Sequence, residues 1–191
     1  MIDAAEAQEV HLTVELGGSD PDVLAAFARL HHCGFLHVLL DTGAHPSQPM
    51  LSWRQAAGID TALKRAAALG QALEQQGMRL LRTKIEAKAD LAAAAQYFEA
   101  HFKVEFDDGK ASELQPLARE LGVHLSRSAF TRSAGKEQRF LTARQGTFAR
   151  ALESFEKVET TLASRGWRVL SVHREAVLYD SNLSLDEGWT T

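Results

Sequence analysis

The chain has 191 residues, of which 45% are hydrophobic and 24% are charged, a composition typical of a globular protein and not of a disordered or fibrous one. The formal net charge is −4 and is spread along the chain, so no partner such as duplex DNA is expected. A single cysteine, Cys33, excludes an intrachain disulfide and favours a reducing, cytoplasmic compartment. No apolar run approaches the roughly 18 residues of a membrane span, so no membrane partner is expected.

The first half of the chain shows alternating patterns that predict strands separated by helices. Residues 11–16 alternate polar and apolar side chains, which predicts a strand with His11, Thr13 and Glu15 on one face. Asp20 and Pro21 then supply an N-cap and a first helical residue, and Gly34 marks the end of this helix. The other elements expected in this half are strands at 35–40, 50–55 and 78–86 and a helix from 60 to 77.

The second half predicts the same order of elements. A strand beginning near Tyr97 includes the alternating run 101–106. A helix at 149–165 places Leu152, Phe155, Val158 and Leu162 toward the core. The other elements expected are a helix at 112–121 and strands at 123–128, 139–145 and 167–179. Residues 180–191 show no periodicity, and a tail without regular structure is expected there.

The two halves also match in sequence at an offset of 89 or 90 residues, as Leu51–Gln55 does with Leu141–Gln145. This predicts an α+β fold made by internal duplication of a ferredoxin-like unit (βαββαβ twice). The expected organisation is a first lobe at 1–88, a linker at 89–96 and a second lobe with the C-terminal tail at 97–191. In such a unit the helices cover one face of an antiparallel sheet, and the other face stays open and polar.

The open faces are expected to gather similar polar residues in both lobes. If the two faces turn toward each other, they form a cleft with pseudo-twofold symmetry. In the first lobe these residues are His11, Thr13, Glu15, Ser52, Arg54, Arg82, Lys84 and Glu86, and in the second they are His101, Lys103, Glu105, Thr142, Arg144, Ser171, His173 and Glu175.

The run His11-Leu12-Thr13-Val14 resembles the His-x-Thr/Ser motif of the two-histidine phosphoesterase superfamily, although the second motif, His101-Phe102-Lys103, has Lys in place of Ser or Thr. The resemblance implies that His11 and His101 are general acid and base, that no cofactor is needed, and that the substrate is a small phosphorylated molecule or a nucleotide. Two imidazoles suit this chemistry because their pKa lies near neutrality. The residues expected to bind the substrate are Thr13, Lys103, Arg54, Arg144, Ser52, Thr142, Lys84 and His173.

Three alternatives stay open. First, His11, Glu86, His101 and Glu175 form a donor set that suits one divalent metal ion, an arrangement that resembles the paired-module metal sites of the glyoxalase and extradiol dioxygenase superfamily. Second, Arg54 and Arg144 suit a non-catalytic binder of a phosphorylated ligand. Third, a polar sheet face is often merely solvated. The run 97–101 also resembles a segment of uncharacterised bacterial proteins of similar length, which implies no function.

Overall fold

The computed structural model describes residues 7–89, 95–130 and 135–188. The strands are β1 (Gln8–Glu15), β2 (Gly34–Leu40), β3 (Ser47–Gln55), β4 (Arg79–Lys88), β5 (Tyr97–Asp107), β6 (His124–Ser128), β7 (Lys136–Gln145) and β8 (Arg168–Asp180). The helices are α1 (Pro21–Leu30), α2 (Ile59–Glu74), α3 (Ala111–Leu121), α4 (Phe148–Ser164) and the 3-10 helix η2 (Leu183–Asp186). The predicted order of strands and long helices is confirmed, whereas most of the linker predicted at 89–96 lies outside the described residues.

Helix α1 begins where the local sequence predicts it. The side chain of Asp20 accepts a hydrogen bond from the backbone N–H of Asp22 at 2.8 Å, and Pro21 is the first helical residue. Leu24 and Phe27 recur at helical spacing and are buried. The helix therefore packs its apolar face on the sheet below it.

The strands form one closed antiparallel barrel, in the order β1, β3, β2, β6, β7, β5, β8, β4 and back to β1. The prediction of two ferredoxin-like sheets with open polar faces is wrong. Strand β2 pairs with β6 and β4 pairs with β8, so strands from both halves share one sheet. The physical reason is that an edge strand leaves N–H and C=O groups unpaired, and joining the edges satisfies these groups.

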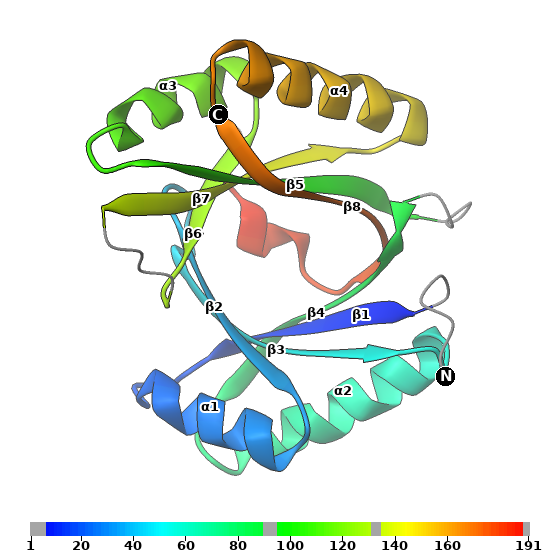
Figure 1. The fold of residues 1–191 in the computed structure, drawn as a ribbon. Coiled ribbons are helices and arrows are strands. Elements are labelled where there is room, and N and C mark those ends of the chain that lie inside the picture. The colour runs from blue at the N-terminus through cyan, green and yellow to red at the C-terminus, as the bar shows by residue number, and fades with distance from the viewer. Residues whose placement is uncertain (1–6, 90–94, 131–134, 189–191) are drawn as a thin grey trace.

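The helices pack on the outside of the barrel, α1 and α2 against the first half and α3 and α4 against the second (Figure 1). In the first core, Leu12 and Val14 of β1 are buried with Leu24 and Leu73. The alternate residues of β1, including His11, consequently face the barrel interior. The alternation in residues 11–16 assigns Leu12 and Val14 to the apolar face of the strand, and both are buried under the helices.

The second core has the same character. Phe102 and Val104 of β5 are fully buried together with Leu117 of α3 and Phe155 of α4. The prediction that Leu152 faces this core is wrong, because its side chain is 39% exposed.

Within the part of the chain that the structure describes, no helix combines the length and the hydropathy needed to cross a membrane.

The C-terminal segment after β8 folds back into the barrel between its two halves (Figure 1, red). The side-chain amide of Asn182 donates to the backbone carbonyl of Leu81 at 3.0 Å, and the backbone N–H of Thr83 donates to the hydroxyl of Ser181 at 2.9 Å. Leu185 is only 2% exposed. Residues 181–188 contain η2 and are otherwise irregular, and they fill part of the interior.

Candidate metal centre in the barrel interior

His11 of β1 contacts a buried carboxylate of the neighbouring strand. Its Nε2 atom lies 3.0 Å from Oε2 of Glu86 on β4 and 3.7 Å from Oε1 of Glu9. The Nδ1 atom of His11 is buried and has no hydrogen-bond partner among the described residues. The imidazole is thus directed at Glu86 through one ring nitrogen.

His101 of β5 has a corresponding environment in the second half of the barrel. Its Nε2 atom lies 3.1 Å from Oε2 of Glu175 on β8 and 3.6 Å from Oε2 of Glu99. Its Nδ1 atom lies 2.9 Å from Oγ1 of Thr142 on β7. Burial disfavours the imidazolium, but the hydrogen bond to Glu175 and the charges of Glu175 and Glu99 outweigh it and raise the pKa of His101.

Three of these side chains converge on one point. Glu86, His101 and Glu175 each offer a ligand atom, and the three atoms lie within 4.8 Å of one another. Ligand atoms at about 2.0–2.2 Å from one metal ion lie roughly 3–4 Å apart, so small side-chain rotations bring this set to ligation distance. Three of the four ligands of the metal alternative thus converge, and the fourth, His11, contacts Glu86 at 3.0 Å but is not part of the convergent set.

Lys84 of β4 contacts one carboxylate from each half of the barrel, Glu86 and Glu99. Its Nζ atom is 2.6 Å from Oε1 of Glu86 and 2.9 Å from Oε2 of Glu99. Burial favours the neutral form of each carboxyl group, but Lys84 and His11 hold the pKa of Glu86 well below its usual value, and Lys84 and Arg144 lower the pKa of Glu99 to about 2. Both carboxylates are therefore charged at neutral pH.

A second group of ion pairs joins the cluster to the C-terminal segment. The guanidinium of Arg82 donates to both carboxylate oxygens of Asp180 and, at 3.0 Å, to Asp186. The hydroxyl of Tyr97 donates to Asp180 at 2.5 Å. Burial would raise the pKa of Asp180, but Arg82 and Tyr97 lower it. The tail residue Asp186 thus belongs to the interior network.

Arg144 of β7 completes the network. It lies 2.6 Å from Oε1 of Glu99 and 2.5 Å from Oδ2 of Asp186, and its guanidinium lies 4.5 Å from the ring centroid of Tyr97. Both carboxylates and the aromatic face are therefore already engaged with this guanidinium. Arg144 acts as a structural cation between β5 and the tail.

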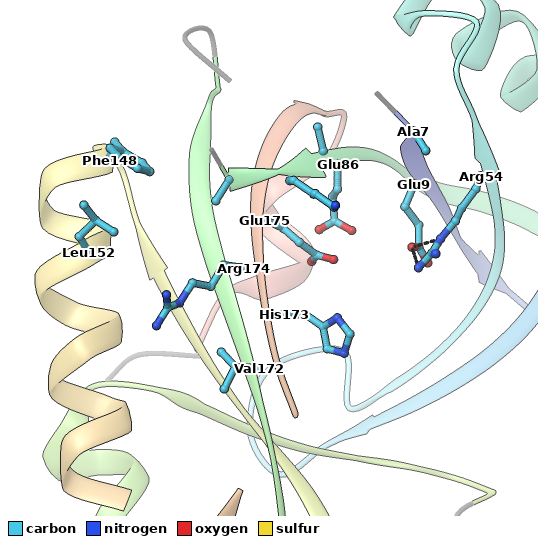
Figure 2. A pocket seen from close by; sticks show the side chains of 13 residues that line it. Ala7, Glu9, Arg54, Glu86, Phe148, Leu152, Val172, His173, Arg174 and Glu175 are labelled. Carbon is cyan, nitrogen blue, oxygen red and sulfur yellow. Dashed lines mark hydrogen bonds and ion pairs between the residues drawn. The ribbon is translucent and has the colours of Figure 1, made fainter. Parts of the chain in front are cut away.

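A cleft of about 490 Å³ reaches this cluster from outside the barrel. Figure 2 shows Glu86 and Glu175 between the ion pair of Glu9 and Arg54 on one side and Phe148 on the other. Neither His11 nor His101 lines the cleft. A small molecule in the cleft would therefore meet the two carboxylates before it meets the imidazoles.

The other residues predicted from sequence take varied positions. Thr13 is buried and lies opposite Arg82 in the β1–β4 register, and Ser52 lies opposite His11 in the β1–β3 register. Lys103 places its Nζ 5.7 Å from the ring centroid of Phe140.

Two further predicted residues lie at the cleft. His173 is exposed and lines it. Arg54 also lines it, with a side chain that is 75% exposed and an Nη2 atom 2.8 Å from Oε2 of Glu9.

Sequence reasoning missed several members of the cluster. Glu9 and Glu99 each precede a central histidine by two residues, so alternation along the strand places them on the same face. Extending the strands toward their beginnings would have found both. Asp186 had no comparable signal, because it lies in a segment without periodicity.

The chain matches no protein-family model and no curated protein. Among solved structures it is similar to a putative glycine cleavage system transcriptional repressor, with 14% identity over 88% of this chain and 97% of that chain and a TM-score of 0.33. It is also similar to a putative chlorite dismutase, with 11% identity over 91% of this chain and 95% of that chain and a TM-score of 0.32. A third similar structure is the acetolactate synthase small subunit from Thermotoga maritima, with 15% identity over 92% of this chain and 96% of that chain and a TM-score of 0.32.

Proposed function

We propose that this protein binds one divalent transition-metal ion inside the barrel, with Glu86, His101 and Glu175 as ligands and His11 beside them, and presents the metal to small molecules in the cleft. The convergence of the three ligand atoms within 4.8 Å carries this proposal. Imidazole nitrogen and carboxylate oxygen suit Zn²⁺, Mn²⁺ or Fe²⁺. With three protein ligands, the side of the metal that faces the cleft stays open for water or substrate.

The surroundings of the ligands support the proposal. A histidine that ligates a metal usually holds its other ring nitrogen in a hydrogen bond. The contact between Nδ1 of His101 and Thr142 has this form and leaves Nε2 for the metal. Lys84 contacts Oε1 of Glu86 and holds this carboxylate in its charged form. The other carboxylate oxygen of Glu86, Oε2, lies 3.0 Å from Nε2 of His11.

The charge of the cluster also favours a cation. Its carboxylates are Glu86, Glu99, Glu175, Asp180 and Asp186, and its permanent cations are Arg82, Lys84 and Arg144. With both histidines neutral, as metal ligation requires, five negative charges thus face three positive ones, and the Glu9–Arg54 pair adds no net charge. Buried charge is costly unless it is paired, and one divalent ion would neutralise the remaining two negative charges.

Phosphoester handling by His11 and His101, which the His-x-Thr resemblance implies, stays a prediction. Two of the cations assigned to phosphate, Lys84 and Arg144, are each paired with two carboxylates, and Arg54 is paired with Glu9. A phosphate would have to displace these partners and would meet Glu86 and Glu175. We therefore favour a metal cation over an anion as the occupant.

Titration of metal-depleted protein with Co²⁺, followed by the visible absorption of the bound ion, tests the proposal. We expect saturation at one Co²⁺ per chain. His101→Ala and Glu175→Gln should weaken binding by at least about tenfold, since each removes a ligand. Glu105→Gln is the matched control, because Glu105 lies on the same face of β5 but pairs with Arg168 at 2.6 Å. Equal binding by all variants would overturn the proposal.

A further inference from the structure

The cleft beside the proposed metal has one apolar wall. Phe148 and Leu152 lie at the start of α4, four residues apart and so on one face of the helix. Their side chains are 45% and 39% exposed although both are large and hydrophobic, and both line the cleft together with Val172 (Figure 2). The ring of Phe148 packs against Phe98 with a centroid distance of 5.4 Å, which holds it at the cleft. This wall suits an apolar group of a ligand.

The same cleft carries a cation that has no carboxylate partner in the described part of the chain. Lys88 lines the cleft, is exposed, and lies opposite Glu175 in the β4–β8 register. The two lining arginines differ from it, because Arg54 pairs with Glu9 and Arg174 pairs with Glu159. The ammonium of Lys88 is thus available to an anionic group of a ligand.

The size of the cleft limits the ligand. Its volume of about 490 Å³ falls within the range of roughly 300–1,000 Å³ that is usual for sites of small organic molecules. The charged ends of Glu86 and Glu175 lie between the apolar wall and the Glu9–Arg54 pair in Figure 2. A molecule of this size would reach both the wall and the carboxylates.

We infer that the ligand of the cleft is a small carboxylic acid with an apolar group, whose carboxylate lies toward Lys88 and the metal and whose apolar group packs on Phe148, Leu152 and Val172. This inference rests on the proposed metal site. A metal between Glu86 and Glu175 neutralises their charge and, with Lys88, makes this part of the cleft positive. The metal-loaded cleft would therefore attract an anion more strongly than the metal-free cleft, whose three acidic and three basic lining residues balance.

The test uses 3-phenylpropionate as the probe. Propionate is the control that lacks the aromatic group, and 3-phenylpropan-1-ol is the control that lacks the carboxylate. Each is titrated calorimetrically into Zn²⁺-loaded and metal-free protein. We expect 3-phenylpropionate to bind the loaded protein at least about tenfold more tightly than either control probe, and more tightly than it binds metal-free protein. Similar affinities for all three probes would overturn the inference.

Two exposed substitutions then locate the ligand. Lys88→Gln and Leu152→Ser should each weaken binding of 3-phenylpropionate about fivefold to tenfold while Zn²⁺ affinity stays unchanged. Their matched controls are Lys157→Gln on α4 and Leu170→Ser on β8, which lie outside the cleft. Unchanged binding in both cleft variants would contradict the inference. A protein that takes up no metal overturns the proposed function and this inference with it, whereas a protein that takes up metal but binds all three probes alike overturns this inference alone.

Discussion

Lys84 and Glu86 form an ion pair in the barrel interior, with Nζ 2.6 Å from Oε1, although their side chains are only 13% and 2% exposed. The two residues are two positions apart on β4, so both side chains project inward. A closed barrel excludes much of the water that would otherwise solvate them. The pair and its neighbours consequently have to neutralise one another, and this requirement dominates the energetics of the interior.

Lys84→Met should destabilise the metal-free protein by about 3–5 kcal/mol, because it leaves Glu86 and Glu99 as buried charges without their shared cation. Urea unfolding followed by circular dichroism measures this change. Arg54→Met is the control, since the exposed pair with Glu9 is worth only about 0–1 kcal/mol. Equal losses in the two variants would mean that the interior pair is solvated.

The C-terminal segment should contribute to stability as a core element does. Leu185→Ala is expected to cost about 2–5 kcal/mol, since Leu185 is 2% exposed. Leu183→Ala, two residues earlier and 54% exposed, should change stability by no more than about 0.5 kcal/mol. Chemical unfolding of both variants checks the difference, and two small, equal effects would show that the segment does not pack inside the barrel.

Acid should destabilise the metal-free protein through Glu99. Its folded-state pKa of about 2 lies below the ordinary value of 4.5, so its contribution is fully present above pH 4.5 and is lost as the pH falls toward 2. Unfolding free energies measured between pH 6 and pH 2.5 should therefore fall more steeply in wild type than in Glu99→Gln. Parallel profiles for the two proteins would contradict this assignment.

Metal should stabilise the folded chain. At a free Zn²⁺ concentration of 100 times Kd, one site adds about 2.7 kcal/mol to the free energy of unfolding if the unfolded chain does not bind. Thermal unfolding with Zn²⁺ and then with excess EDTA checks that the gain is reversible. Glu86→Gln should lose the gain and Glu105→Gln should retain it. A gain of equal size in both would place the bound metal elsewhere.

Much of the local structure was predictable because strand periodicity is a local property. Alternation in β1 correctly separates Leu12 and Val14, which pack under the helices, from His11, which faces the interior. Pairing between edge strands leaves no such signal. Strand β2 meets β6 through only three residue pairs, such as Leu39 with Arg127, and nothing in their periodicity specifies a partner.

The site was partly predictable for the same reason. The pattern groups His11, Glu86, His101 and Glu175 because they occupy similar strand positions in the two halves. Closure of the barrel brings Glu86, His101 and Glu175 together, with His11 in contact with Glu86. The role of the tail was not predictable. Asp186 reaches Arg82 and Arg144 only through the tertiary fold.

Anomalous diffraction from crystals soaked in Mn²⁺ or Zn²⁺ tests the metal site most directly, because it locates the ion and does not only count it. The proposal predicts one strong anomalous peak at about 2.0–2.2 Å from a carboxylate oxygen of Glu86, Nε2 of His101 and a carboxylate oxygen of Glu175. The peak should be absent from crystals of Glu175→Gln soaked in the same way. A wild-type crystal with no peak among these three side chains, and with the contact between His101 and Glu175 intact, would contradict the proposal.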